Sequence, residues 1–469
     1  MGWVHASGMQ DFVGRGAELA LLEKQLAQPT GALVPIYGRR RVGKSELIRR
    51  FVQGKLALYH VGKTAPGGLQ LKELLADAAR VLEEPLLAHL PDNDWRTALD
   101  TVVSRARGKL VLVLDEFQWL VAASPELPSV LQELWDRSWR ASGKVMVILC
   151  GSYVGFMERE VLGKKSPLFG RRTAQILLRP FPFREAVAFH PRYSTVDNAL
   201  AYFICGGVPL YLRCFDGERS IESNIESLIL DEYGPMAREP DFLLREELRD
   251  VESYYALLWA IAAGRVSIKE MASDTGLPER SLHYYLNQLT GLGYVARVYP
   301  LSGVAAPARH VRFVLDDPLL RFWFRFVFPH QSLIQQVGPT KALREHLRPL
   351  LPAYFGECFE RLCRESLGGL YRQEGISATF RAGEYWDKHV QIDVVGMRDD
   401  GFIDLGECKW GAVRSLAVVA DELAAKVPRF PNPANRTIAR RLFVRSRGKQ
   451  QPPGVRVHDL ESLCAGQEP

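Results

Sequence analysis

Cysteine is scarce and unpaired in this sequence. Its seven cysteines lie at positions 150, 205, 214, 358, 363, 408 and 464 and form no C-x-x-C pair. The pattern therefore indicates neither a disulfide framework nor a zinc site. No apolar run approaches the ~18 residues that a membrane span requires, and residues 1–6 lack the basic start and apolar core of a signal peptide. We expect a cytoplasmic protein that does not contact a membrane.

Low-complexity segments and internal repeats are also missing, and the composition is that of a folded protein. Hydrophobic residues make up 47% and charged residues 24% of the 469 residues, and the net charge is +6. This balance excludes a disordered chain and permits contact with nucleic acid. The most apolar stretch, 322–328, is flanked and interrupted by Arg321 and Arg325, which favours an aromatic packing segment.

The order of apolar patterns predicts four segments. Short strand-like runs alternate with amphipathic stretches up to residue 183, which is typical of a parallel sheet with helical crossovers; these runs are 33–37, 56–61, 110–114, 144–150 and 173–178. Residues 184–250 and 251–330 are predicted to be mainly helical. Residues 331–469 return to an α/β pattern, with strands expected at 390–395, 402–408 and 441–444.

A phosphate-binding loop is the most specific motif. The segment Gly38-Arg39-Arg40-Arg41-Val42-Gly43-Lys44-Ser45 matches G-x-x-x-x-G-K-[ST] and lies between an apolar strand and a helix. In such a loop, backbone N–H groups and the helix N-terminus bind phosphates. Lys44 is expected to reach the β and γ oxygens, and Ser45 to bind Mg²⁺.

Acidic and polar residues at the ends of later strands complete the predicted nucleotide site. Asp115 ends the run 110–114 and is expected to hold Mg²⁺, while Glu116 would activate the attacking water. Ser152 ends the next strand and either senses the γ-phosphate or forms a turn. Arg171 is expected to stabilise the transferred phosphate, either in its own subunit or in a neighbouring one. The alternative is that Arg171 and Arg172 bind only water or DNA phosphate.

These motifs together resemble the archaeal-type ATPases of the AAA+/STAND group. Residues 11–19, with Val13, Gly14 and Arg15, look like the opening box that contacts the adenine side of the nucleotide. The triplet 39–41, the segment 114–118 and the segment 206–212 also match the family pattern, the last in its helical lid. The resemblance implies ATP as the nucleotide, a five-stranded parallel sheet, and a lid over 184–250.

A helix-turn-helix with a wing is predicted over 251–330. Ser253 to Gly264 has a helical pattern, Ser267 to Glu270 forms a capping box, and Pro278 suits the first position of a third helix. Strands are expected at 294–299 and 311–315. Side chains suited to DNA are then expected on the third helix and the wing: Arg280, Ser281, His283, Tyr284, Asn287, Gln288, Arg297, Arg309, His310 and Arg312. A packing or oligomerisation module is the alternative.

A second metal site is predicted near the C-terminus. Asp393 precedes Glu407-Cys408-Lys409 by 14 residues, and alternate residues of a strand share a face. Such carboxylates bind Mg²⁺ or Mn²⁺, and Lys409 would stabilise the charge of a scissile phosphate. A surface strand with solvated charges is the alternative interpretation.

The second site resembles the PD-(D/E)xK nuclease core attached to this ATPase family. The resemblance covers roughly 352–447 and implies that Glu360 is the core's helical glutamate, with Glu357 as the alternative. Gln391 departs from the pattern, which has a glutamate there. The fold expected for the whole chain is thus α/β: a P-loop ATPase with a lid, a winged helix-turn-helix, and a restriction-endonuclease-like domain over 331–469.

Three functions are compatible with these motifs. The first is an ATP-dependent enzyme that binds double-stranded DNA and cleaves it with the C-terminal metal site. The alternative is an ATP-controlled DNA-binding or assembly switch without nuclease activity. A relative of replication loaders, working as a homo-oligomer with Arg171 supplied between subunits, is the third.

Overall fold

The structure is a computed structural model that describes residues 12–91, 94–304, 310–448 and 451–465. Asp11 of the predicted opening box and Arg309 of the predicted wing lie outside these residues. The chain divides into two compact units, with the boundary between Pro180 and Phe181. Each unit is described by itself.

The first unit is built on a five-stranded sheet in which every pairing is parallel, in the order β2-β3-β4-β1-β5. The strands are β1 (Ala32–Tyr37), β2 (Ala57–Val61), β3 (Leu110–Asp115), β4 (Val145–Gly151) and β5 (Ile176–Leu177). The predicted five-stranded parallel sheet is thus confirmed. The fifth strand is shorter than expected. The Leu33 N–H donates to the Thr173 hydroxyl, and in a regular ladder it would donate to a backbone carbonyl.

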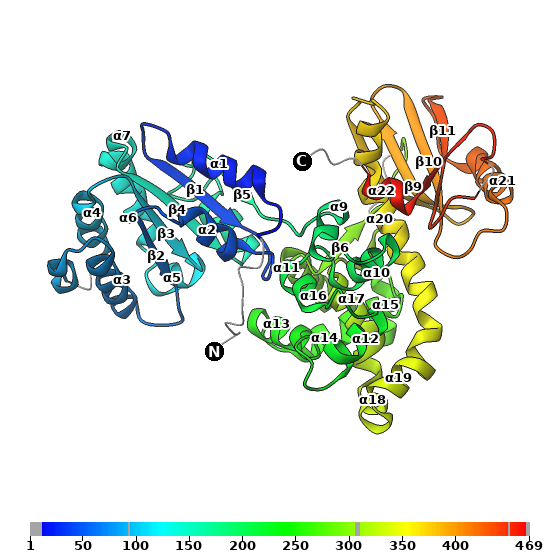
Figure 1. Cartoon of the computed structure of the whole chain (residues 1–469), viewed down its shortest axis with the longest axis horizontal. Coiled ribbons are helices and arrows are strands. Elements are labelled where there is room, and N and C mark those ends of the chain that lie inside the picture. The colour runs from blue at the N-terminus through cyan, green and yellow to red at the C-terminus, as the bar shows by residue number, and fades with distance from the viewer. Residues whose placement is uncertain (1–11, 92–93, 305–309, 449–450, 466–469) are drawn as a thin grey trace. The chain divides into compact units, whose positions relative to one another are not determined.

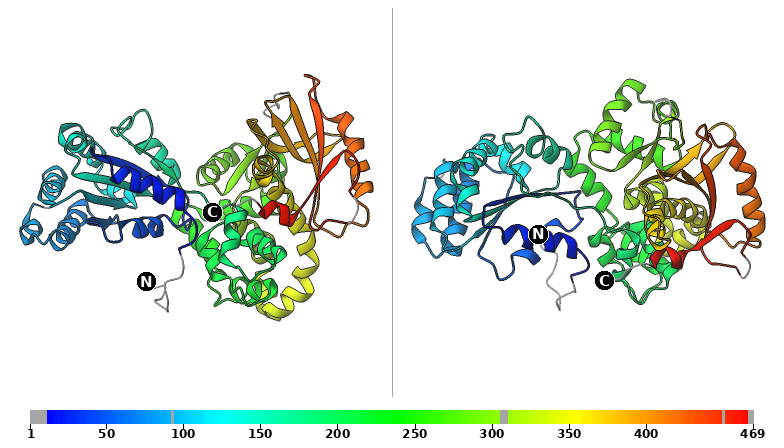
Figure 2. Two further views of the ribbon diagram at one scale, coloured as in Figure 1. Left: turned by 45° about the horizontal axis from the view of Figure 1, so that its top comes forward. Right: turned by 90° about the horizontal axis from the view of Figure 1, so that it is seen from above.

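Helices cover both faces of this sheet, as Figures 1 and 2 show. Leu22 of α1 and Leu47 of α2 pack against one face, whereas α3 to α6 pack against the other. Strands buried on both faces explain the continuous apolar runs in the sequence. The helices are α1 (Gly16–Leu26), α2 (Lys44–Val52), α3 (Gly67–Val81), α4 (Trp95–Arg105), α5 (Phe117–Ala123), α6 (Leu127–Leu134), α7 (Arg140–Ser142) and α8 (Val154–Phe156).

The second unit begins with helices. They are α9 (Phe183–Ala186), α10 (Thr195–Cys205), α11 (Pro209–Cys214), α12 (Ile221–Ile225), α13 (Glu239–Glu247), α14 (Val251–Ala262), α15 (Ile268–Thr275), α16 (Glu279–Gly291), α17 (Pro318–Phe322), α18 (Gln331–Val337) and α19 (Pro339–Ala342). The predicted aromatic packing segment is confirmed, since Phe322, Phe324 and Phe326 are fully buried. Short π or 3-10 turns complete the helical parts of both units: 85–89, 135–139, 157–161, 187–189, 226–230, 323–327, 328–330, 343–347, 348–350 and 427–429.

Three of these helices and one hairpin follow the predicted order over 251–330. The capping box is present: the Ser267 side chain accepts from the Glu270 N–H, and the Glu270 carboxylate accepts from the Ser267 N–H. Pro278 is the N-cap of α16, one residue before the predicted position, because its ψ of 137° is extended. The antiparallel hairpin consists of β6 (Val295–Val298) and β7 (Arg312–Leu315).

A separate mixed sheet forms the C-terminal part of the second unit, in the order β12-β11-β10-β9-β8. Its strands are β8 (Phe380–Trp386), β9 (Gln391–Arg398), β10 (Phe402–Lys409), β11 (Thr437–Val444) and β12 (Val455–Asp459), with helices α20 (Leu351–Gln373), α21 (Leu416–Lys426) and α22 (Leu460–Cys464). The face carrying Val394 packs on α20, and the face carrying Leu405 packs on α21. Sequence patterns did not predict β8 or β12.

Across the described residues, no helix combines the length and apolar character needed to cross a membrane. All seven cysteines are free.

Candidate nucleotide site and acidic cluster

The phosphate-binding loop connects β1 to α2, and the local structure requires glycine at both Gly38 and Gly43. Gly43 has a φ of 90°, a left-handed conformation that favours glycine. A Cβ on Gly38 would lie 2.2 Å from the carbonyl oxygen of Leu178, so any side chain there would displace the start of the segment after β5. Arg39 and Arg40 are half-buried and Arg41 is exposed, while Val42 is buried beneath the loop.

Lys44 is held over the loop. Its side chain is buried, and Nζ donates to the carbonyl oxygens of Gly38 and Arg39, both at 2.8 Å. Burial, together with the nearby Arg40 cation, lowers the pKa of Lys44, against the opposing effect of Asp115 and Glu116. A buried ammonium ion is costly without an anion, so this position favours a phosphate group.

Ser45 and Asp115 meet at the end of β3. The Ser45 hydroxyl donates to Asp115 Oδ2 at 3.0 Å, and Oδ1 accepts from the Glu116 N–H at 2.9 Å. The hydroxyl of Tyr59, on β2, also donates to Oδ2. Burial and the adjacent carboxylate raise the pKa of Tyr59. A hydroxyl beside a carboxylate suits the oxygen preference of Mg²⁺, so Ser45 and Asp115 fit this cation.

Glu116 is oriented through both carboxylate oxygens. Ser152, at the end of β4, donates to Oε1 at 2.9 Å, and the Gln118 amide donates to Oε2. Because β4 lies between β3 and β1 in the sheet, Ser152 lies between the strand of Glu116 and the strand of the loop. Glu116 has a φ of 50°, unusual for a residue with a side chain. Sequence reasoning missed Tyr59, which belongs to no recognisable spacing. It gave no role to Gln118, although that residue lies in the segment 114–118 that matches the family pattern.

Arg15 connects the predicted opening box to the loop. Its guanidinium donates to the carbonyl oxygens of Val42 at 3.3 Å and Arg179 at 2.6 Å, and it pairs with Glu18 at 3.2 Å. Val13 is half-buried, and Gly14 is exposed with a φ of 65°.

Arg171 is engaged elsewhere within the first unit. Its guanidinium binds both carboxylate oxygens of Asp136, at 2.6 to 3.1 Å, and donates to the Pro167 carbonyl at 2.8 Å. A bidentate pair of this kind fixes the guanidinium plane. Any role at a transferred phosphate therefore requires Arg171 to leave Asp136.

In the second unit, the structure brings Asp393, Glu407 and Lys409 together. Asp393 on β9 and Glu407 on β10 are both buried, and Asp393 Oδ2 accepts from the Cys408 N–H at 2.9 Å. Burial and the charge of Glu407 raise the pKa of Asp393 to about 6. Lys409 contacts Glu407 Oε1 at 3.2 Å, and Lys426 of α21 contacts Oε2 at 2.6 Å. Sequence reasoning missed Lys426.

Glu360 of α20 faces the same cluster. Burial, Asp393 and Glu384 of β8 raise the pKa of Glu360 to about 8, against the effect of Arg364. The Arg364 guanidinium lies 3.9 Å from Glu360 and 3.7 Å from Glu384. We name Glu360, Glu384, Asp393 and Glu407 the acidic cluster. Glu357, the alternative helical glutamate, is exposed.

The acidic cluster fits a divalent cation in chemistry but is not a preformed ligand set. Its carboxylate oxygens are the ligand type that Mg²⁺ and Mn²⁺ prefer. Among the described residues, however, no three histidine, cysteine or acidic side chains are arranged to hold a metal ion. Lysines occupy both oxygens of Glu407. A cation at Glu407 would have to displace at least one of them.

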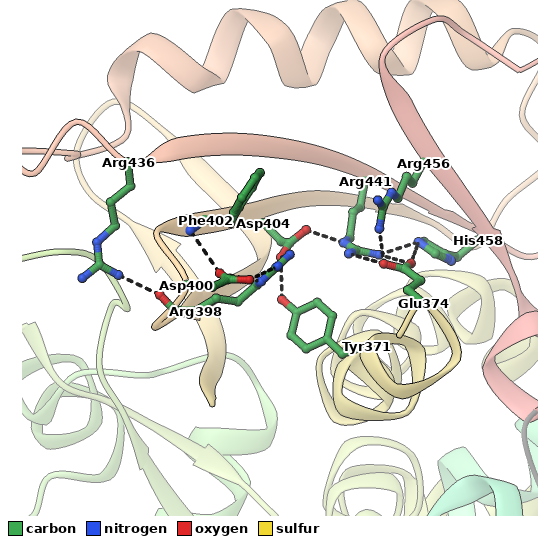
Figure 3. A network of polar contacts seen from close by, with 10 residues as sticks. All are labelled: Tyr371, Glu374, Arg398, Asp400, Phe402, Asp404, Arg436, Arg441, Arg456 and His458. Atoms are coloured by element: carbon green, nitrogen blue, oxygen red, sulfur yellow. Dashed lines mark hydrogen bonds and ion pairs between the residues drawn. The ribbon is translucent and has the colours of Figure 1, made fainter. Parts of the chain in front are cut away.

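A buried ionic network lies elsewhere on the same sheet (Figure 3). Arg441 of β11, which is 1% exposed, binds Asp404 at 2.6 Å and Glu374 at 2.6 and 2.8 Å. Tyr371 donates to Asp404 at 2.7 Å. Burial and Arg441 lower the pKa of His458 to about 4. Every carboxylate shown here has a cationic partner, which identifies the network as structural rather than as a binding site.

Two families match parts of the chain. Residues 12–215 match a family described as an ATPase domain predominantly from Archaea, and residues 323–419 match one described as Archaea bacterial proteins of unknown function. The chain therefore carries a P-loop ATPase domain of the archaeal type, followed by the C-terminal domain of the second family.

Three known proteins are similar to this chain. An uncharacterized protein of Methanocaldococcus jannaschii, MJECL04, is 27% identical over 83% of the chain and 85% of its own length. An uncharacterized ATP-binding protein of the same organism, MJ0423, is 44% identical over 48 residues, which is 10% of the chain and 81% of that protein. The Walker-type ATPase PABY2304 of Pyrococcus abyssi is 19% identical, with a TM-score of 0.48, over 67% of the chain and 97% of its own.

Proposed function

We propose that the first unit binds Mg²⁺-ATP and hydrolyses it. One observation carries the proposal: Lys44 and Ser45, after β1, converge with Asp115 and Glu116, at the end of β3, and each is held by hydrogen bonds. Lys44 binds the phosphates, and Ser45 and Asp115 hold Mg²⁺. The cation neutralises charge on the phosphates when it is bound. Glu116 orients the attacking water.

ATP turnover and nucleotide affinity test this proposal separately. Lys44→Ala removes the phosphate contact, so we expect at least tenfold weaker ATP binding by calorimetry. Glu116→Gln keeps the side-chain size and is expected to bind ATP while turnover falls at least a hundredfold. Lys63→Ala, an exposed lysine paired with Glu73, is the control. Full turnover by Glu116→Gln would exclude this residue as the catalytic base.

We further propose that the second unit binds DNA and cleaves it at the acidic cluster. The order of three helices and a hairpin over 251–315 supports a winged helix-turn-helix, with Arg280, His283, Tyr284 and Asn287 exposed on α16. The proximity of Asp393, Glu407 and Lys409 supports a phosphodiesterase site. Glu360, Asp393 and Glu407 would hold Mg²⁺ or Mn²⁺, and Lys409 would bind the phosphate.

The competing function is an ATP-controlled DNA-binding or assembly switch that does not cut. The two lysine contacts on Glu407 favour it, because they neutralise the carboxylate that a metal would need. Linear and supercoiled double-stranded DNA, incubated with the protein and Mg²⁺ or Mn²⁺, with and without ATP, separates the two functions. If wild type cuts DNA and Lys409→Ala does not, the nuclease is supported. If Lys44→Ala also fails to cut, cleavage is controlled by ATP. The absence of products from wild type, with ATP bound, favours the switch.

A further inference from the structure

A large cavity opens within the second unit beside the acidic cluster. Its volume is about 1270 Å³, and its walls come from the hairpin β6–β7, helix α20 and strand β8. Pockets for small ligands usually measure ~300–1,000 Å³. The cavity is thus larger than one small ligand requires, which favours an extended occupant.

The lining has an unusual charge pattern. Seven arginines and no lysine line the cavity, against five acidic residues. Arginine presents a planar set of donors that matches phosphate oxygens, and it stacks on aromatic rings and bases. Phe380, which is 38% exposed, provides aromatic surface among the arginines.

Three of the arginines crowd one another on the α20 side. Arg361 lies near both Arg321 and Arg364, and burial and these two cations lower the pKa of Arg361. Arg361 pairs with Asp316 at 2.9 Å, whereas the Arg321 guanidinium reaches its oxygen partners only at 3.5 Å. Asp316 and Glu365 oppose this effect on Arg361, and a polyanion in the cavity would add further anionic partners for the arginines.

The cavity is continuous with both proposed DNA elements. On the hairpin side, Arg312 of β7 lines it and stacks on Trp386 of β8, 4.1 Å from the ring centre. The Leu301 N–H donates to the Glu384 carbonyl at 2.7 Å, which joins the segment after β6 to β8. On the other side, Arg364 lines the cavity and donates to the Asp393 carbonyl at 2.7 Å. Glu360 and Glu384 belong to both the cavity wall and the acidic cluster.

We propose that this cavity binds the sugar-phosphate backbone of one DNA strand and leads it from the hairpin to the acidic cluster. The inference rests on the proposed DNA function and adds the binding surface to it. The arginines contact phosphates without reading bases, so binding is independent of sequence and weakens with salt.

Binding of a fluorescent dT12 oligonucleotide to the full-length protein, by anisotropy, tests the proposal. Arg321→Ala/Arg361→Ala is expected to raise the Kd at least tenfold and to lower the slope of log Kd against log salt by about one to two. Arg372→Glu, an exposed residue of the cavity rim, is expected to raise the Kd without any change in the melting temperature. Arg344→Glu, an exposed arginine of the same unit outside the lining, is the control.

Each further outcome has a defined meaning. Unchanged dT12 affinity in both the double variant and Arg372→Glu would overturn the proposal. So would competition by micromolar AMP or inorganic phosphate in the Lys44→Ala protein, because a small anion would then be the occupant. If wild type binds dT12 and the arginine variants weaken this binding, but wild type cuts no DNA, the nuclease is refuted and the strand-binding cavity remains supported.

Discussion

The Ser152 hydroxyl lies 2.9 Å from Glu116 Oε1, so the end of β4 orients the carboxylate that follows β3. Ser152→Ala removes this donor and leaves the Gln118 contact in place. We expect ATP turnover to fall about tenfold, with the Kd for ATP within twofold of wild type, since the serine acts on the water-orienting group. Steady-state hydrolysis and calorimetry measure the two effects, and the exposed Ser129→Ala is the control. An equal loss of affinity would assign Ser152 to ATP binding instead.

Tyr59→Phe tests the support of the proposed magnesium ligand. The phenol donates to Asp115 Oδ2 from a neighbouring strand, and a hydrogen bond to a charged group contributes about 1.5–3 kcal/mol. We expect the free energy of unfolding to fall by an amount in this range, measured with urea. Tyr153→Phe, at an exposed tyrosine of the same unit, should change it by less than about 0.5 kcal/mol. A neutral Tyr59→Phe would mean that Ser45 and the Glu116 N–H position Asp115 without the phenol.

The position of Arg171 yields a prediction with two separable outcomes. If the guanidinium leaves Asp136 to stabilise the transferred phosphate, Arg171→Ala lowers the turnover number at least tenfold at unchanged ATP affinity. We expect this result, with Asp136→Ala retaining turnover. Mixing Arg171→Ala with Lys44→Ala protein then tests action between subunits, because restored turnover requires an arginine donated by a neighbour. Equal thermal destabilisation by Arg171→Ala and Asp136→Ala, with turnover intact, would make the pair structural.

Gly396 lies directly beneath the Tyr371 hydroxyl. A Cβ at this position would stand 2.1 Å from Tyr371 Oη, which donates to the buried Asp404. We expect Gly396→Ala to destabilise the second unit by about 2 kcal/mol. In a Tyr371→Phe background the clash with Oη is gone, so the added cost of the alanine should fall by at least half. Additive costs in this double-mutant cycle would contradict the assignment.

The stability of the second unit should depend on pH through His458. Its pKa is about 4 in the folded chain and 6.5 in the unfolded chain, so between these values the unfolded state binds the extra proton. The contribution of His458 to stability is therefore complete above pH 6.5 and decreases as the pH falls, by about 3 kcal/mol near pH 4. The raised pKa values of Glu360 and Asp393 act in the opposite direction over this range, so the contribution of His458 is measured as the difference in free energy of unfolding between wild type and His458→Gln. This difference should decrease from pH 7.5 to pH 4.5, whereas the difference between wild type and the exposed His283→Gln should not change with pH in this way.

The sequence predicted those parts of the nucleotide site whose residues follow a fixed spacing along the chain. The loop from Gly38 to Ser45 and the acidic pair after an apolar strand were recognisable because phosphate binding demands those residue types in that order. Continuous apolar runs predicted four of the five parallel strands nearly to the residue. The sequence pattern overextended β5. The Thr173 N–H does donate to the Leu33 carbonyl, but the Leu33 N–H donates to the Thr173 hydroxyl and not to a backbone carbonyl.

The remaining contacts depend on tertiary neighbours. Tyr59 acts through Asp115 on the neighbouring strand, and no spacing marks it. Gln118 lies in the segment 114–118 that matches the family pattern, but only the structure shows that its amide donates to Glu116. Strand β8 was missed because its first residues are exposed and carry no apolar alternation. Lys426 lies on a helix whose charges resemble any solvated face, and only the packing of α21 on the sheet brings it to Glu407.

The reactivity of Cys150 reports on local opening of the ATPase domain. The thiol is fully buried at the end of β4, and burial and the nearby Asp115 raise its pKa well above the usual value. Almost no thiolate is present in the closed sheet, so alkylating reagents can modify this position only when the strands separate. The rate of Cys150 modification therefore measures how often the sheet opens locally at the nucleotide site. Bound ATP should slow that rate in proportion to the stabilisation that it supplies.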